Sequence, residues 1–295
     1  SLMPQLRKKT INFPLNLGNP KLLLRLVNLL SSIRMMLYWA VELSRRTLIN
    51  NKNPLAVVIL AAGKGTRMGS DLPKVLHEVG GIPMICQVVN TAKAIGADRI
   101  IPVLGYKYEM VQDILKDEHL EFVLQLQQLG TAHAVLQCKK LLSDFNGDVL
   151  ILYGDAPLIT KNTLQNLLNI HNKSGAPATI LTTDLPDPFG YGRIIRNPDN
   201  SLNKIVEEKD ATEKEQTQKE VNSGFYVFKA KELFELLPQI GNENAQNEYY
   251  LPDVLNMLIN KKEKVAIDKV NNYIEIQGVN NTEQLNEVNE YYEKA

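Results

Sequence analysis

The chain has 295 residues with 44% hydrophobic content, which is enough for a full hydrophobic core in one large domain. Lysines plus arginines equal aspartates plus glutamates at 33 each, so the composition gives no reason to expect a nucleic-acid partner. The only cysteines, Cys86 and Cys138, exclude a disulfide scaffold and a cysteine-rich zinc site, and they favour a reducing, cytoplasmic location.

The first predicted element is an amphipathic helix at 21–43, within an N-terminal extension at 1–53. On a helical wheel its polar residues fall on one side and its apolar residues on the other. The apolar side comprises Leu22, Leu26, Leu29, Leu30, Ile33, Leu37 and Ala40. Because Arg25 and Arg34 interrupt this segment, it has no uncharged run near the roughly twenty residues that a bilayer span needs. We expect the helix to pack on its own domain, to self-associate, or to make a peripheral membrane contact, and disorder of the segment is the remaining alternative.

The next predicted elements alternate between buried strands and amphipathic helices. The apolar run 55–60 is typical of a strand covered on both faces. The predicted helices after it are 82–95, 107–117 and 131–142, and the predicted strands are 99–104, 120–124 and 148–152. Since parallel neighbours need crossover helices, this order predicts an α/β fold with a doubly wound, mostly parallel sheet. Ligands are then expected at the carboxyl ends of its strands.

The pattern loosens after residue 178. Strand-like pieces occur at 179–183, 194–195, 202–206 and 224–229. Thr212 and Glu215 have capping-box spacing for a short helix between the last two pieces. We therefore divide the domain at 54–295 into a nucleotide-binding half at 54–177, a smaller acceptor-binding half at 178–281 and a C-terminal helix at 282–295.

The strongest chemical signal is the segment LAAGKGTRMGSDLPK at 60–74, directly after the first predicted strand. Its glycines let main-chain N–H groups approach phosphates, while Lys64, Arg67 and Lys74 bring positive charge to the same loop. The spacing matches neither the dinucleotide-binding fingerprint nor the Walker loop. The segment therefore predicts a triphosphate-binding loop, in preference to a plain glycine turn with solvated cations.

This segment resembles the signature of the sugar-phosphate nucleotidyltransferases, L-A-A-G-x-G-T-R-M followed by L-P-K. Further matching motifs are QLQQLGTAHAV from Gln125, LYGDAPL from Leu152, GYGRI from Gly190, IVEEKDA from Ile205, VNSGFY from Val221, NAQNEYYLPD from Asn244 and GVNN from Gly278. Within the family, the chain looks most like the domains that uridylylate N-acetylglucosamine 1-phosphate, from about residue 55 to about residue 281. The resemblance implies a mixed, Rossmann-like nucleotidyltransferase sheet and a role in supplying a peptidoglycan precursor.

The resemblance implies that a sugar 1-phosphate attacks the α-phosphate of UTP in line and that pyrophosphate leaves, with Mg²⁺ assisting. Arg67 and Lys74 match the catalytic cations of the family, and Asp155 and Asn280 match its magnesium ligands. Without the resemblance, Asp155 would be read as a turn or helix cap and Asn280 as an ordinary loop residue.

The resemblance also implies two binding sets. The nucleotide set is Leu60, Ala61, Ala62, Gly63, Lys74, Gln125, Gly130 and Thr131. The sugar set is Tyr153, Gly154, Asp155, Gly192, Glu207, Asn222 and Tyr249. Without the family, Glu207 would be read as a solvated charge, and the four scattered histidines suggest neither a zinc site nor a catalytic base.

Several alternatives to this function stay open. The same chemistry with glucose 1-phosphate and UTP or dTTP is the nearest, and a non-catalytic module that binds sugar nucleotides is a remote one. A dehydrogenase is disfavoured by the glycine spacing of the loop. Hexapeptide repeats are absent from the sequence, so we expect no acetyltransferase β-helix domain here.

Overall fold

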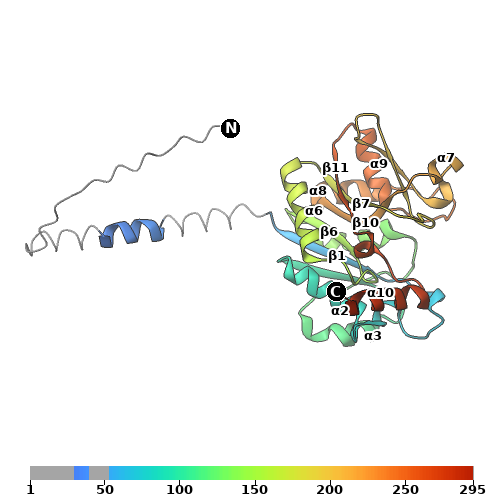
Figure 1. Cartoon of the computed structure of the whole chain (residues 1–295), viewed down its shortest axis with the longest axis horizontal. Coiled ribbons are helices and arrows are strands. Elements are labelled where there is room, and N and C mark those ends of the chain that lie inside the picture. The colour runs from blue at the N-terminus through green and yellow to red at the C-terminus, as the bar shows by residue number, and fades with distance from the viewer. Residues whose placement is uncertain (1–29, 40–52, 295) are drawn as a thin grey trace, which may run out of the picture. The chain divides into compact units, whose positions relative to one another are not determined.

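The computed structural model describes residues 30–39 and 53–294. Contacts divide the chain into two units, residues 1–52 and 53–295, which are described separately. In the first unit, residues 30–39 form a helix, drawn in blue in Figure 1, where the sequence predicts one. The rest of the predicted helix, at 21–29 and 40–43, lies outside the described residues. Among the described helices, none is long and apolar enough to cross a membrane.

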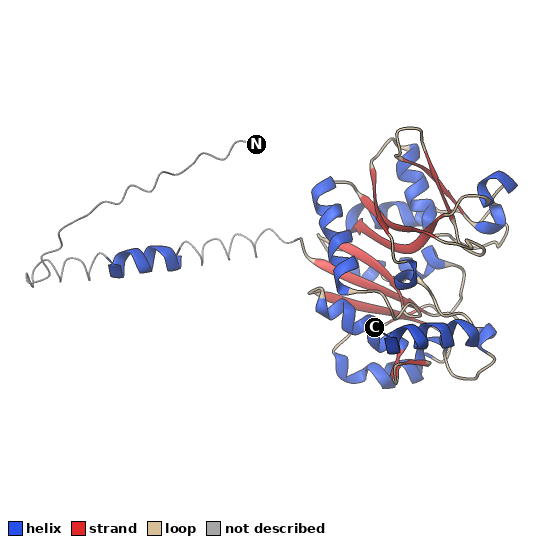
Figure 2. Ribbon diagram, viewed as in Figure 1, coloured by secondary structure: helices blue, strands red, loops and turns tan. Residues whose placement is uncertain are grey.

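The second unit is built on a nine-stranded sheet in the order β11-β7-β10-β6-β1-β4-β5, in which β8 pairs with β10 and β9 pairs with β8. Figure 2 draws the strands in red and the helices in blue. The strands are β1 (Leu55–Ala61), β4 (Arg99–Leu104), β5 (Val123–Leu124), β6 (Asp148–Tyr153), β7 (Ala178–Asp184), β8 (Arg193–Arg196), β9 (Leu202–Val206), β10 (Glu220–Lys229) and β11 (Val265–Val270). β1 runs parallel to β4 and β6, whereas β10 is antiparallel to both β6 and β7. The sheet is therefore mixed and mostly parallel, which confirms the predicted fold class.

Helices cover both faces of this sheet. The helices of this unit are α2 (Met84–Ala94), α3 (Tyr108–Leu115), α4 (Thr131–Leu136), α5 (Lys139–Leu142), α6 (Lys161–Ser174), α7 (Glu213–Gln216), α8 (Ala230–Leu236), α9 (Pro252–Asn260) and α10 (Thr282–Lys294). Side chains of β1 alternate between two cores, because successive residues of a strand point to opposite faces. Val58 packs in the core that contains residues of α4, α8 and α9, and Val57 and Ile59 pack in the core that contains residues of α2, α3 and α6.

The register of the central strands brings their carboxyl ends to one edge. Leu60 pairs with Tyr153 of β6, and Ala61 pairs with Leu104 of β4. The loops that follow these three strands therefore start next to one another. This edge is where the predicted site residues gather.

Several predicted elements differ in extent from those observed; the strand predicted at 224–229, for example, begins at Glu220. The helix predicted from residue 82 begins at Met84, because Gly80 and Gly81 have positive φ and turn the chain so that β3 (Ile82–Pro83) pairs with β2 (Glu78–Val79). The strand predicted at 120–124 shortens to β5. The helix predicted at 131–142 splits into α4 and α5, since Cys138 N–H bonds the carbonyl of Val135, three residues back.

Candidate active site

The glycine-rich loop follows β1 and leads into a 3₁₀ turn at Thr66–Met68. Gly65 has φ 64°, and a Cβ added to it would lie 2.5 Å from Cβ of Lys74. Both the left-handed backbone and this close approach require glycine. The sequence between Gly65 and Lys74 thus folds back so that the start of the loop lies against the lysine that ends it.

Four predicted site residues meet at one point. Lys74 forms an ion pair with Asp155, and its Nζ donates a hydrogen bond to Oδ1 of Asn280 over 3.0 Å. Arg67 Nη2 donates to the same Asn280 oxygen over 3.1 Å. The predicted catalytic pair and the predicted metal pair, which come from three distant segments, therefore form a single cluster.

The chain positions Asp155 and Asn280 through their backbones. Asp155 follows the carboxyl end of β6, and its carbonyl accepts a hydrogen bond of 2.9 Å from N–H of Val279. The N–H of Asn280 donates to Oε1 of Gln284, at the start of α10, over 2.7 Å. Since the two side chains present oxygens to one ammonium group, they converge on a position suited to a cation.

Oxygen donors of this kind suit Mg²⁺, which is usually held by one or two protein groups together with phosphates and water. Asp155 supplies an anionic oxygen and Asn280 a neutral one, so the donor set fits. Within 30–39 and 53–294, no group of three His, Cys, Asp or Glu side chains forms a protein-only metal cage. A metal here would depend on the substrate for its remaining ligands.

The predicted nucleotide set lies along the same edge. The carbonyl of Leu60 accepts from N–H of Gly154 over 2.9 Å, which ties the ends of β1 and β6 together. Gln125 is only 4% exposed, and its Nε2 donates to the carbonyl of Gly130 over 3.0 Å. Thr131 Oγ1 accepts from N–H of Leu251 over 3.0 Å. These bonds fix the loop before α4 relative to the start of α9.

His133 is an unpredicted part of this arrangement. Its Nδ1 lies 3.0 Å from Nε2 of Gln125, and its Nε2 lies 3.1 Å from Nε2 of Gln137. His133 therefore helps to fix the orientation of the Gln125 amide. No sequence motif relates His133 to Gln125, because the two side chains meet only when α4 has folded against the loop that contains Gln125.

Three residues of the predicted sugar set lie together. Asn222 N–H donates to the carbonyl of Gly192 over 2.8 Å, and a Cβ at Gly192 would lie 2.8 Å from Oε1 of Glu207. Oδ1 of Asn222 accepts from the hydroxyl of Tyr226 over 2.8 Å. Glycine at position 192 is thus what lets the Glu207 carboxyl approach the backbone.

The carboxyl of Glu207 is perturbed. Burial, together with the negative charges of Asp253 and Asp210, raises its pKa to about 7, although the hydrogen bond from Asn222 opposes the shift. Glu207 therefore holds its proton much more tightly than an exposed glutamate does. It is not the solvated charge that its sequence neighbours would suggest.

The two predicted tyrosines have different surroundings. The Tyr153 ring packs edge-on against Phe225 at a centroid distance of 6.1 Å, and a Cβ at Gly224 would lie 2.5 Å from the same ring. Burial raises the pKa of Tyr153 well above its usual range. The backbone of Tyr249 instead bonds Leu129 and Ala132, so Tyr249 lies with the loop before α4.

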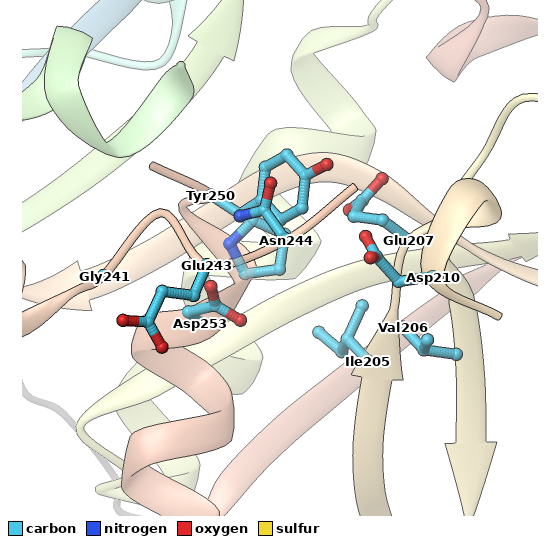
Figure 3. A pocket seen from close by; sticks show the side chains of 10 residues that line it. Ile205, Val206, Glu207, Asp210, Gly241, Glu243, Asn244, Tyr250 and Asp253 are labelled. Atoms are coloured by element: carbon cyan, nitrogen blue, oxygen red, sulfur yellow. The ribbon is translucent and has the colours of Figure 1, made fainter. Parts of the chain in front are cut away.

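A pocket of about 370 Å³ adjoins Glu207 (Figure 3). It is lined by Ile205, Val206, Glu207, Asp210, Gly241, Glu243, Asn244, Tyr250, Pro252 and Asp253. Tyr250 lines it, whereas its predicted neighbour Tyr249 does not. Adjacent tyrosines give the sequence no means to decide which one reaches a pocket.

The contact of Lys107 with the phosphate loop is a further feature that motif matching missed. The Tyr106 ring lies near two ammonium groups. Its centroid is 5.4 Å from Nζ of Lys107 and 5.6 Å from Nζ of Lys64. Such distances are typical of cation–π contacts. Lys107 also donates to the carbonyl of Asp71 over 2.6 Å, so it links the end of β4 to the loop after β1.

Comparison with known proteins identifies the family of the chain. Residues 57–243 match the model of the MobA-like NTP transferase domain. The chain belongs to this family. The nucleotidyltransferase assignment made from the loop and its companion motifs is therefore confirmed.

Relatives in streptococci are similar over most of the chain. The chain is 51% identical over 223 residues to the bifunctional protein GlmU of Streptococcus uberis, which is 76% of this chain and 48% of that protein. The GlmU proteins of Streptococcus agalactiae and Streptococcus mutans are 50% and 49% identical over the same shares. The chain thus spans about half the length of the curated relatives it matches.

A solved structure supports the fold. The chain is similar, with a TM-score of 0.64 and 19% sequence identity, to a putative glucose-1-phosphate thymidylyltransferase from Bacillus anthracis in complex with a sucrose. The match covers 82% of this chain and 96% of that one. At this identity it supports the fold alone.

Proposed function

We propose that the chain transfers UMP from UTP to N-acetylglucosamine 1-phosphate, giving UDP-N-acetylglucosamine and pyrophosphate. The observation that carries this proposal is the cluster of Arg67, Lys74, Asp155 and Asn280 at the carboxyl edge of the sheet of a nucleotidyltransferase. The identity of about 50% to streptococcal GlmU proteins supports the choice of substrates.

In this mechanism a phosphate oxygen of the sugar 1-phosphate attacks the α-phosphorus of UTP. A new P–O bond forms as the bond from the α-phosphorus to the bridging oxygen of pyrophosphate breaks, and pyrophosphate carries away the electron pair. No side-chain nucleophile is needed, so the protein acts by positioning and by neutralising charge. Arg67 and Lys74 are the groups that supply positive charge at this edge.

Asp155 and Asn280 would hold Mg²⁺, which supplies a Lewis acid to phosphate oxygens when it is bound. Lys74 would then release Asp155 and turn to phosphate oxygens, because its four-carbon stem lets the ammonium move over a short distance. Arg67 would remain beside Asn280 with its fork available for a second pair of oxygens.

Recognition of uracil would depend on Gln125 and the backbone at 60–63. Since Nε2 of Gln125 is held by Gly130, its carbonyl oxygen is directed toward the N3–H of uracil in this proposal. Cytosine lacks a proton at N3, so a buried acceptor would lose its partner, at a cost of about 1–3 kcal/mol. Thr131 and Gly130 would close the opposite side of the base.

The acceptor sugar would bind where Glu207, Asn222 and Gly192 meet. Glu207 is suited to accept hydrogen bonds from sugar hydroxyls, and Asn222 offers an amide to the acetamido group. Tyr153 and Tyr249 would contribute apolar walls on either side. These roles rest on the family motifs together with the short distances among Glu207, Gly192 and Asn222.

We also propose a cytoplasmic location and the domain division stated above, with residues 54–295 as the catalytic domain. Both cysteines are free thiols, which is compatible with a reducing compartment. UTP and a sugar 1-phosphate would be the small-molecule partners. Sugar-nucleotide synthesis of this kind would feed cell-wall biogenesis.

A pyrophosphate-release assay tests the nucleotide half of the proposal. UTP, CTP, dTTP and ATP are each supplied with N-acetylglucosamine 1-phosphate and Mg²⁺. We expect UTP to give the highest kcat/KM, by at least tenfold over CTP. A chain that binds sugar nucleotide but releases no pyrophosphate with any of the four would be a binding module, and the proposal would fail.

A further inference from the structure

The helix at residues 30–39 exposes an unusual amount of apolar surface. Seven of its ten residues are large apolar side chains, each between 44% and 73% exposed. They are Leu30, Ile33, Met35, Met36, Leu37, Tyr38 and Trp39. Exposed apolar groups at this density mark a contact surface and are not typical of a solvated helix.

The apolar side chains are not confined to one side. At about 100° per residue, Leu30, Ile33 and Leu37 share the side predicted from the sequence, while Met35 and Trp39 project from the opposite side. A single protein groove covers one side of a helix. A medium that surrounds more of the helix accounts better for this distribution.

Charge is strongly segregated along the chain. Residues 1–53 contain nine lysines and arginines against one glutamate, which leaves 24 lysines and arginines against 32 aspartates and glutamates in residues 54–295. The net charge of zero therefore conceals a cationic segment joined to an anionic domain. Such asymmetry favours contact with an anionic surface outside the protein.

We propose that the helix at residues 30–39 docks the enzyme on an anionic lipid bilayer. Apolar side chains of the helix would enter the interface, while the lysines and arginines of residues 1–53 would supply the positive charge that attracts anionic lipid headgroups. Tyr38 and Trp39 are the side-chain types enriched at the level of the headgroups. A second copy of the chain is a poorer occupant, because it would bring two cationic segments together.

Trp39 provides a direct measurement, because it is the only tryptophan of the chain. Full-length protein is titrated with vesicles of phosphatidylcholine alone or with about 30% phosphatidylglycerol, and tryptophan emission and co-sedimentation are recorded. We expect emission to move to shorter wavelength, and protein to sediment, only with the anionic vesicles. Raising NaCl to about 0.5 M should weaken the binding, since the headgroup attraction is screened.

Two double variants separate the helix from other exposed apolar residues. Ile33→Glu with Leu37→Glu alters the proposed surface and keeps Trp39. Met110→Glu with Ile114→Glu makes the same change of charge at the same spacing on α3, where both side chains are more than 40% exposed. We expect the first variant to lose at least tenfold in vesicle affinity and the second to bind like the unmodified chain.

Replacing Arg45 and Arg46 by Gln tests whether the positive charge of the N-terminal segment contributes to vesicle binding. Each cation near an anionic surface contributes about fivefold to binding, so roughly 25-fold is expected for the pair. Equal binding to neutral and anionic vesicles, or equal loss in the two double variants, would overturn the proposal. Short-wavelength emission without vesicles would overturn it as well, pointing to a second copy if it depends on protein concentration and to the chain's own domain if it does not.

Discussion

Arg67 is the cation of the cluster with no carboxylate partner recorded in the described part of the chain, since its hydrogen bond goes to the neutral Asn280. Its charge is thus available to phosphate oxygens. We expect Arg67→Ala to fold normally and to lose on the order of a hundredfold in kcat, the scale for a preorganised group that acts on a transition state. Steady-state pyrophosphate release and a thermal melt measure both quantities. A kcat within a few fold of the unmodified chain would remove Arg67 from catalysis.

Asp155 carries the only formal negative charge of the proposed metal pair. Replacing it by Asn keeps the shape but removes an anionic ligand, so the Mg²⁺ concentration for half-maximal rate should rise at least tenfold. Asp184→Asn is the control, because Asp184 pairs with Lys269 on the surface. An unchanged Mg²⁺ titration for Asp155→Asn would exclude this aspartate as a ligand.

Glu207 predicts a pH dependence of acceptor binding. Its pKa of about 7 means that the carboxylate form, which accepts charge-assisted hydrogen bonds from sugar hydroxyls, grows between pH 6 and 8. Relative to the unmodified chain, Glu207→Gln should therefore show a KM ratio for the acceptor that rises over this range. Using the ratio cancels the titration of the substrate phosphates. A ratio that stays constant with pH would contradict the role of Glu207.

The same shift predicts the sign of a stability effect. A carboxyl whose pKa is raised on folding binds its proton more tightly in the folded state, so stability falls as pH rises from the ordinary value of 4.5 to about 7. Glu207→Gln cannot ionise and avoids this loss. Its advantage in the free energy of unfolding should grow over that interval, to about 3 kcal/mol at most, and then level off. Urea titrations at pH 5 and pH 8 provide the comparison.

At the scale of elements, the phosphate loop depends on one close approach. Gly65→Ala places a Cβ against Lys74 in a left-handed backbone, whereas Gly69→Ala has a similar φ of 61° with nothing within 4 Å. Both variants carry backbone strain of about 1 kcal/mol, but only the first displaces Lys74. We expect Gly65→Ala to lose at least tenfold more kcat/KM for UTP than Gly69→Ala. Equal losses would mean that the packing against Lys74 has no catalytic consequence.

Local sequence predicts elements well where one pattern dominates. The apolar run at 55–60, the strand at 99–104 and the capping box of Thr212 with Glu215 all appear as predicted, because burial or a local hydrogen bond determines each. The antiparallel position of β10 between β6 and β7 is different. It depends on which strands pair across long separations, and a buried strand has the same composition in either direction.

The site shows the same division. The motifs single out Arg67, Lys74, Asp155 and Asn280 as site residues. They do not show that Lys74 contacts both Asp155 and Asn280. Likewise, the pKa of Glu207 arises from burial and from charges contributed by other segments. Such properties exist only once the chain has folded, so no single motif contains them.

For the whole molecule, we assign catalysis to the acidic domain and membrane docking to the basic N-terminal segment. The acceptor and nucleotide sites assigned here all lie between Leu60 and Asn280, within the unit at 53–295. The chain covers about half the length of its streptococcal relatives. We therefore attribute the proposed uridylyl transfer to an acetylated amino sugar to this unit.

The most direct test of that claim compares acceptors at equal UTP and Mg²⁺. N-acetylglucosamine 1-phosphate, glucosamine 1-phosphate and glucose 1-phosphate are each supplied to the chain, and the UDP-sugar formed is separated and quantified. We predict that the acetylated acceptor is preferred over both others by roughly fivefold to more than a hundredfold in kcat/KM, the range for one buried polar group left unpaired. Preference for glucose 1-phosphate would contradict the acceptor assignment, and formation of no UDP-sugar from any of the three would contradict the account as a whole.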